Sequence, residues 1–294
     1  MPGWPKGISL VIPACNEQAA IAGVLEEVHA SLARVGVPFE IIVVDDGSTD
    51  GTAGQVDTKR FRLIRNPANL GYGASLKAGA REATYDCILI TDADGTYPSE
   101  EIGTLYRDLE KADMAVGART GVDVQIPWVR RPAKWALNRL ANYLTGTRIP
   151  DLNSGFRAVR REIWECYEHY FPNGFSLTTT ITLASLSDGR RVVFHPINYR
   201  ARVGNSKIRP IRDTLNFIQL ILRTVFYFDP LKVLLPVSLV LMGLGGIVGV
   251  GTLILQNCFG IGKFMDVTTQ LLILTGLQIL AIGGLADLVS KRLK

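Results

Sequence analysis

The sequence predicts an α/β fold with a mainly parallel sheet, followed by an interfacial helix and two transmembrane helices. Three observations carry this prediction. Short apolar runs alternate with amphipathic patterns over residues 8–118, polar clusters follow the ends of several runs, and two long uncharged stretches lie near the C-terminus. Continuous apolar strands separated by helices are typical of parallel sheets that are covered on both faces.

The elements of the α/β part follow one another in a regular order. Apolar runs predict strands over Ile8–Pro13, Phe39–Val44, Phe61–Arg65, Cys87–Thr91 and Met114–Gly117. Between them, the sequence pattern predicts helices over Glu17–Arg34, Gly71–Ala83 and Ser99–Glu110. The first helix carries its apolar residues at helical spacing, which indicates one face directed toward the sheet.

Two uncharged stretches predict transmembrane helices. Val233–Leu255 has 23 residues and Val267–Ala286 has 20, and both are rich in glycine. Each can cross a hydrocarbon core of about 30 Å, which takes about 20 helical residues. Small residues let two membrane helices approach closely, which also favours self-association. A pair of buried soluble helices is the alternative, and the length and lack of charge argue against it.

The basic charge is concentrated at the C-terminal end of the chain. The protein carries 32 Lys and Arg against 27 Asp and Glu, a net charge of +5. Residues 1–198 have a net charge of −2, whereas residues 199–294 have a net charge of +7. The basic residues flank the apolar stretches, which argues against nucleic acid as the partner. The positive-inside rule places both termini in the cytoplasm and the loop Gln256–Asp266 outside.

The segment between the α/β part and the first span predicts an interfacial helix. Leu215, Ile218, Leu222 and Val225 repeat at helical spacing among basic residues. Such a helix lies along the cytoplasmic leaflet, and a core helix of the soluble domain is the alternative. The resulting domains are an α/β domain over residues 1–208, the interfacial helix over 209–230 and a transmembrane hairpin over 231–294.

Acidic clusters follow two of the predicted strands. Asp92 and Asp94 come directly after one strand, and Asp45 and Asp46 after another. Ligands of open α/β sheets bind beyond the carboxyl ends of the strands. Two carboxylates can hold one divalent cation that bridges to a substrate phosphate. A lone D-x-D pattern is commonly a turn, but the second acidic turn favours a metal and nucleotide site.

A basic cluster precedes the interfacial segment. Residues 200–207 hold Arg200, Arg202 and Lys207 around a glycine. Arginine makes forked contacts to phosphate and lysine provides a point charge, so the cluster could clamp a pyrophosphate or a lipid phosphate. A juxtamembrane patch attracted to anionic lipid is the alternative.

In combination, the ordered motifs resemble glycosyltransferase family 2. They are Val11-Ile-Pro13-Ala-Cys-Asn16-Glu17, Val44-Asp45-Asp46-Gly47-Ser48-Thr49-Asp50, Asn69-Leu70-Gly71, Asp92-Ala-Asp94, Gly117-Ala-Arg119, Asp151-x-x-Ser154-Gly155-x-Arg157 and Gly204-x-Ser206-Lys207. With the terminal membrane pair, the chain resembles the polyprenyl-phosphate glycosyltransferases, which include dolichyl-phosphate mannose synthases and undecaprenyl-phosphate glucosyltransferases.

The resemblance implies a GT-A fold and inverting transfer of a hexose from UDP-glucose or GDP-mannose to undecaprenyl or dolichyl phosphate. By the same resemblance, the nucleotide sugar is held by Pro13, Ala14, Asn16, Glu17, Asp45, Asp46, Ser48, Asp92 and Ser206. The metal, Mg²⁺ or Mn²⁺, is bound by Asp92 and Asp94. The catalytic residues are Asp94, Asp151, Arg119, Arg202 and Lys207. Thr96 departs from many dolichyl-phosphate mannose synthases, which have glutamine there as a further metal contact.

The charges of the substrates indicate a mechanism without a strong general base. A phosphate monoester has a second pKa of about 6, so most of it is a dianion at neutral pH. The acceptor is thus already a nucleophile, and its approach to a second polyphosphate is opposed by electrostatic repulsion. Arg119, Arg130, Arg131 and the basic cluster could screen this repulsion, while Asp151 orients a substrate.

Two other functions are compatible with parts of the sequence. A processive polysaccharide synthase usually carries a Q-x-x-R-W motif and more spans, which this sequence lacks. A membrane-anchored nucleotide-sugar binding protein without activity would not need both metal carboxylates and the basic cluster.

We predict that Asp94→Asn abolishes sugar transfer, whereas Asp151→Asn retains part of it, because only the first removes a metal ligand. Transfer of labelled sugar to polyprenyl phosphate by purified variants measures both. Equal and total loss in two folded variants would contradict a mechanism without a general base.

Overall fold

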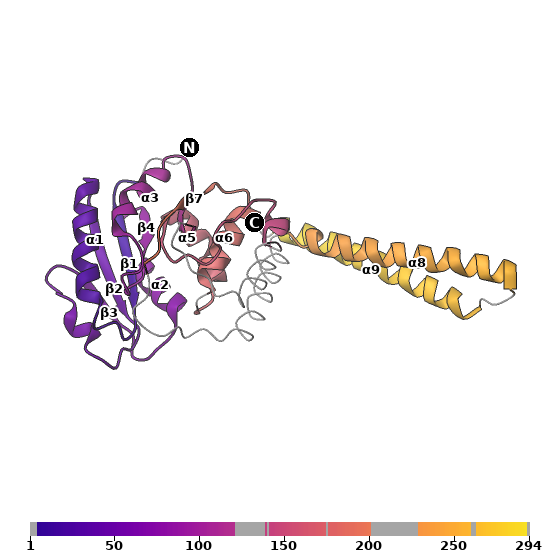
Figure 1. Ribbon diagram of the computed structural model, residues 1–294, viewed down its shortest axis with the longest axis horizontal. Coiled ribbons are helices and arrows are strands. Elements are labelled where there is room, and N and C mark those ends of the chain that lie inside the picture. Colours follow the sequence, from indigo (N-terminus) through magenta and orange to yellow (C-terminus); the bar gives the residue numbers. More distant parts are fainter. Residues whose placement is uncertain are drawn as a thin grey trace. The chain divides into compact units, whose positions relative to one another are not determined.

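The computed structural model describes residues 5–120, 139, 141–174, 176–200, 229–259 and 263–292. The chain divides into two compact units, Met1–Ile221 and Leu222–Lys294. The first unit contains a sheet with helices packed against it, and the second contains two long helices (Figure 1). The predicted interfacial helix over 209–230 lies outside the described residues, apart from its last two positions.

The described strands of the first unit form one seven-stranded sheet in the order β3-β2-β1-β4-β6-β5-β7. Their bounds are Ile8–Ala14 (β1), Phe39–Asp45 (β2), Arg62–Arg65 (β3), Cys87–Ile90 (β4), Met114–Ala118 (β5), Arg157–Arg160 (β6) and Val192–Pro196 (β7). The predicted mainly parallel sheet is confirmed, because β1, β2, β3 and β4 pair in parallel, as do β5 and β7. The central strands β1 and β4 are wholly buried, as their continuous apolar sequences require.

Strand β6 is the exception, since it is antiparallel to both of its neighbours, β4 and β5. Its sequence, Arg-Ala-Val-Arg, has no apolar run and gave no strand signal. All four residues are nevertheless buried. The insertion of β6 separates β4 from β5 in the sheet and brings the turn that precedes β6 to the carboxyl end of β4.

Helices cover the sheet, and their bounds are Ile21–Val35 (α1), Tyr72–Arg81 (α2), Ile102–Asp108 (α3), Arg161–Tyr167 (α5) and Leu177–Ser187 (α6). Of these, α1, α2 and α3 correspond to the three predicted helices, whereas α5 and α6 were not predicted. The apolar face of α1 is buried in the main core, as its spacing predicted. This helix begins four residues later than predicted, and the backbone N–H groups of the residues before it, Asn16, Glu17 and Gln18, bond to the loop after β2.

The second unit consists of α8, Leu231–Phe259, and α9, Lys263–Arg292. Within these helices, Leu231–Asn257 and Val267–Ser290 are long and apolar enough to cross a membrane, as predicted. The predicted loop Gln256–Asp266 is wrong at both ends, because the helices continue to Phe259 and resume at Lys263. Backbone hydrogen bonds of a helix do not depend on whether its side chains are apolar. The two helices therefore extend beyond the uncharged stretches from which they were predicted.

Glycines bring α8 and α9 into close contact. A Cβ atom on Gly276 would lie 3.1 Å from the carbonyl oxygen of Ser238, and one on Gly249 would lie 3.0 Å from Cγ2 of Thr269. The Ser238 hydroxyl also donates a 2.8 Å hydrogen bond to the carbonyl oxygen of Gly276. The two helices therefore pack at a distance that only small residues allow.

We predict that Gly79→Ala destabilises the sheet unit by about 1–3 kcal/mol, because the new methyl group would overlap Val11 in β1. The matched control is Gly23→Ala in α1, where the methyl group meets nothing within 4 Å. That variant should be more stable by up to about 1 kcal/mol, since alanine favours helices. Thermal unfolding of the full chain in detergent measures both, and a stable Gly79→Ala variant would contradict the packing of α2 on β1.

Candidate active site

The loops after β1 and β2 are joined by hydrogen bonds at the carboxyl edge of the sheet. Asn16 has a left-handed backbone with φ of 57°, and its side-chain oxygen accepts the N–H of Thr49 at 2.8 Å. The N–H of Asn16 donates to the Ser48 hydroxyl at 3.0 Å. The N–H of Glu17 donates to the Thr52 hydroxyl at 2.9 Å. Three predicted nucleotide contacts, Asn16, Glu17 and Ser48, thus lie on one pair of joined loops.

The two consecutive aspartates at the end of β2, Asp45 as its last residue and Asp46 directly after it, have different surroundings. Asp45, which is 1% exposed, accepts the N–H of Ser48 at 3.0 Å and lies 3.5 Å from the Nε of Arg65. Asp46 accepts the backbone N–H groups of Leu70 and Gly71, each at 2.9 Å, and the side-chain amide of Asn66 at 2.8 Å. Asp46 therefore holds the loop before α2 in place.

The pKa of Asp46 reflects these contacts. Burial by itself raises the pKa of the carboxyl group, because it disfavours the charged form. The hydrogen bonds from Asn66, Leu70 and Gly71 together outweigh burial and hold the pKa below its usual value. The folded protein thus favours the ionised form of Asp46.

Asp92 and Asp94 lie beyond the carboxyl end of β4, and both are partly exposed. The Tyr72 hydroxyl donates to Oδ1 of Asp92 at 3.0 Å. Thr96 donates to Oδ1 of Asp94 through its hydroxyl group at 2.6 Å and its N–H at 3.2 Å. Thr96 stands where many dolichyl-phosphate mannose synthases have glutamine, and here it orients the carboxylate of Asp94.

The donor set of this pair fits a magnesium or manganese ion. Within the part of the chain that the structure describes, His, Cys, Asp and Glu side chains form no group of three or more that could hold a metal. Carboxylate oxygens are hard ligands, and Mg²⁺ is commonly bound by one or two carboxylates with substrate phosphates and water completing its octahedron. Two partly exposed aspartates suit that mode.

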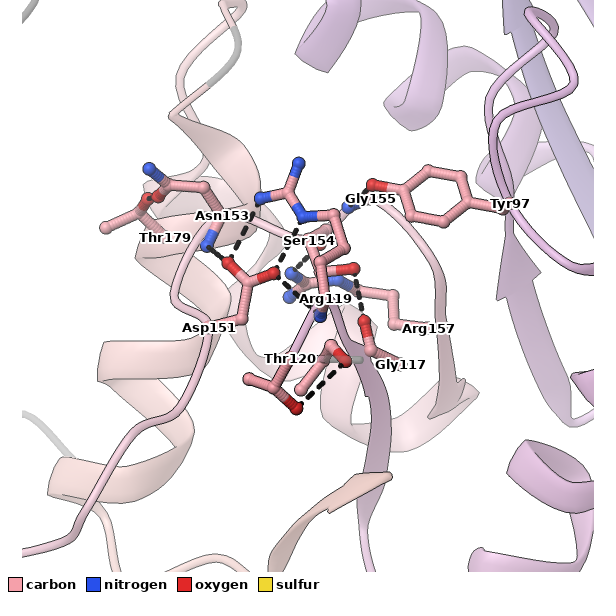
Figure 2. Close-up of polar contacts among 11 residues, drawn as sticks. Tyr97, Gly117, Arg119, Thr120, Asp151, Asn153, Ser154, Gly155, Arg157 and Thr179 are labelled. Atoms are coloured by element: carbon pink, nitrogen blue, oxygen red, sulfur yellow. Dashed lines mark hydrogen bonds and ion pairs between the residues drawn. The ribbon is translucent and has the colours of Figure 1, made fainter. Parts of the chain in front are cut away.

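Arg119, which follows β5, and Asp151, which precedes β6, form a forked ion pair (Figure 2). Nε and Nη2 of Arg119 lie 2.7 Å and 3.0 Å from the two carboxylate oxygens of Asp151, and the N–H of Arg119 also donates to that carboxylate. The guanidinium lies over the ring of Tyr199, 5.3 Å from its centroid. Burial opposes the charge of Arg119, but the hydrogen bonds with Asp151 raise its pKa above the usual value.

The turn between Asp151 and β6 packs directly against Asp92. The N–H of Gly155 donates to the Tyr97 hydroxyl at 2.8 Å, as Figure 2 shows. A Cβ atom on Gly155 would lie 2.7 Å from the Tyr72 hydroxyl and 3.0 Å from Oδ1 of Asp92. Only glycine allows this approach. Tyr72 and Tyr97 were not predicted as site residues, because a tyrosine within a loop or at a helix start carries no distinguishing sequence pattern.

Of the other predicted site residues, Pro13 and Ala14 are buried at the end of β1, where they pair with Val44 and Asp45. Arg200 lies at the edge of the described region, with its guanidinium 3.3 Å from Glu27. The remaining predicted phosphate contacts, Arg130, Arg131, Arg202, Ser206 and Lys207, lie outside the described residues.

The fold has clear counterparts among solved structures. The chain is similar to glucosyl-3-phosphoglycerate synthase from Mycobacterium tuberculosis, solved with Mn²⁺, UDP and phosphoglyceric acid. The TM-score is 0.59, with 20% identity, and the match covers 76% of this chain and 84% of that chain. Another structure of that enzyme contains Mg²⁺ and UDP. The fold is thereby of the GT-A type that the sequence predicted.

The chain belongs to glycosyltransferase family 2, whose model matches residues 9–168, more than half of its length. It is 30% identical to polyprenol monophosphomannose synthase of Mycolicibacterium smegmatis, over 68% of this chain and 80% of that protein. It is 28% identical to undecaprenyl-phosphate 4-deoxy-4-formamido-L-arabinose transferase of Pseudomonas fluorescens, over 97% of this chain and 85% of that protein. The resemblance seen in the motifs is thereby confirmed.

We predict that Asp46→Asn lowers the free energy of unfolding by roughly 1–3 kcal/mol at pH 7, because an amide nitrogen would face backbone N–H donors. Since the folded pKa of Asp46 is depressed, its contribution is present above the unfolded pKa of about 4 and is lost as the pH falls through the folded value. Denaturation from pH 7 to pH 3 measures the difference, with the exposed Asp57→Asn as control. A difference that grows with acid would contradict this assignment.

Proposed function

We propose that this protein catalyses metal-dependent, inverting transfer of a hexose from a nucleotide diphosphate sugar, UDP-glucose or GDP-mannose, to a polyprenyl phosphate. The observation that carries the proposal is the acidic pair Asp92 and Asp94 beyond β4, with the turn that follows Asp151 packed against Asp92 through Gly155. The names of both curated relatives, which state a polyprenol or an undecaprenyl phosphate, support the lipid acceptor.

Asp92 and Asp94 would hold Mg²⁺ or Mn²⁺ in the proposed enzyme. When bound, such an ion stabilises the negative charge that develops on a departing diphosphate. The hydroxyl groups of Tyr72 and Thr96 each fix one of the two carboxylates by a hydrogen bond. This arrangement limits the movement of the ligands before the donor binds.

The joined loops after β1 and β2 would bind the nucleoside. Glu17 is partly exposed there, whereas Asp45 is buried and supports the second loop by accepting the N–H of Ser48. Pro13 and Ala14 lie at the end of the strand from which the first loop leaves. Asn16 and Ser48 hold the two loops together, and Asp46 fixes the adjoining loop before α2. We therefore assign Asp46 to the support of the nucleotide site.

The acceptor phosphate would need its charge screened from the diphosphate of the donor more than it would need to lose a proton. A phosphate monoester is largely ionised at neutral pH. The Asp151 carboxylate already accepts three hydrogen bonds from Arg119, which suits an orienting role better than that of a base. Arg119 would meet a substrate phosphate, together with the predicted contacts Arg202, Ser206 and Lys207.

The two long helices support a membrane location. We propose that α8 and α9 span the membrane as a hairpin, with the catalytic domain over residues 1–208 and both termini in the cytoplasm. The segment over 209–230 would lie along the same leaflet. The catalytic domain would then lie on the same side of the membrane as the basic segments that flank the two helices.

We predict that purified full-length protein forms a lipid-linked sugar from one donor of a labelled panel. The panel offers UDP-glucose, GDP-mannose and the nucleotide-linked form of 4-deoxy-4-formamido-L-arabinose, each with undecaprenyl or dolichyl phosphate. EDTA should abolish product formation, and Mg²⁺ or Mn²⁺ should restore it. The anomeric configuration of the product, measured by NMR, should be opposite to that of the donor.

Each other result of the panel contradicts part of the proposal. Binding of a nucleotide sugar without any lipid product would indicate an inactive binding protein. A polymeric product would indicate a processive synthase. Product from the arabinose donor alone would contradict a hexose, and full activity in EDTA would contradict the metal.

A further inference from the structure

Arg157 is a charged residue without exposure that the proposed chemistry does not use. It lies in β6, is 0% exposed, and is paired in the sheet with Ile90, two residues before Asp92. Burial lowers the pKa of its guanidinium to about 10, so the side chain is still protonated at neutral pH. A buried charge is costly unless specific contacts stabilise it, and those contacts indicate what it does.

The acceptors of Arg157 among the described residues are all uncharged. Nη1 donates to the carbonyl oxygen of Thr178 at 3.0 Å and to the hydroxyl of Thr182 at 3.1 Å, both in α6. Nη2 donates to the carbonyl oxygen of Ser154, in the turn that precedes β6 (Figure 2). One guanidinium therefore joins helix α6 to the Ser154–Gly155 turn.

This turn is the one that packs against the acidic pair. Gly155 follows the carbonyl group that Arg157 holds, and a Cβ atom there would lie 3.0 Å from Oδ1 of Asp92. A second link joins the same two elements, because the Thr179 hydroxyl donates to the side chain of Asn153 at 2.6 Å. A displacement of the turn toward the acidic pair would press on Asp92, and a displacement away would remove the wall behind it.

We propose that Arg157 is a positioning residue, which fixes the Ser154–Gly155 turn against Asp92 and thereby sets the geometry of the acidic pair. The inference rests on the proposed metal role of that pair. It assigns to Arg157 an effect on metal binding and turnover that acts through the turn, without contact with a substrate. Outer-shell partners of metal ligands typically change affinity or activity about 10–100-fold when they are replaced.

The chain contains a matched control in the same strand. Arg160 is also buried and donates to main-chain oxygens, those of Ala112 and Leu109. It pairs with Cys87 at the opposite end of β4, away from Asp92. Replacement of either arginine by lysine removes the fork and retains the charge, so both variants should lose stability. Only Arg157→Lys should disturb the acidic pair.

The test compares Arg157→Lys and Arg160→Lys in the full-length protein in detergent. We expect Mn²⁺, titrated alone and followed by electron paramagnetic resonance, to bind Arg157→Lys about 10–100-fold more weakly than wild type. We expect kcat to fall with it, while KM for the lipid acceptor changes little. Arg160→Lys should keep wild-type Mn²⁺ affinity despite a similar loss in thermal stability. If Arg157→Lys does not fold, Thr182→Val, which removes one acceptor, replaces it.

A double-mutant cycle identifies the route of the effect. Gly155→Ala should weaken Mn²⁺ binding by itself, and its combination with Arg157→Lys should be non-additive, because both act through one turn. Combination with Arg160→Lys should be additive. A wild type that binds Mn²⁺ and transfers sugar, with Arg157→Lys equal to Arg160→Lys, overturns this inference alone. A wild type that does neither overturns the proposed function and this inference with it.

Discussion

The antiparallel pairing of β6 with β4 is the constraint on which the candidate site depends. Asp92 follows β4 and Arg119 follows β5, and these two strands are separated in the sheet by β6. Because β6 runs in the opposite direction, the turn that precedes it arrives at the carboxyl end of β4. That turn supplies Asp151 to Arg119 and Gly155 to the wall beside Asp92. A parallel strand at this place would put the turn at the other edge of the sheet.

Many polar side chains of the candidate site hold loops or other side chains in place. Asn16 and Ser48 form hydrogen bonds that join the loops after β1 and β2, and Asp46 accepts hydrogen bonds from the loop before α2. Thr96 and Tyr72 each orient one carboxylate of the acidic pair. Loops are held here by side chains because they lack the repeating backbone bonds of strands and helices. Several residues of the predicted nucleotide and metal motifs therefore stabilise the loops of the site through hydrogen bonds.

Two buried charged side chains, Asp151 and Arg157, also form hydrogen bonds that join separate parts of the chain. The carboxylate of Asp151 is 2% exposed and is matched by the forked guanidinium of Arg119, a geometry that adds direction to the electrostatic attraction. Arg157 is buried among main-chain and hydroxyl oxygens instead, which ties two elements together at one point. A buried ion pair contributes little net stability, because the cost of removing both charges from water offsets their attraction.

The sequence by itself determined the elements whose signal is local. Five strands, the apolar face of α1, the two long apolar helices and the position of Asp92 and Asp94 after a strand all follow from periodicity and apolarity within short windows. The tertiary structure alone decided the direction of β6, the pairing of Arg119 with Asp151 across 32 positions and the burial of Arg157. These features depend on the order of strands in the sheet, which brings distant residues together and leaves no trace in any single stretch of sequence.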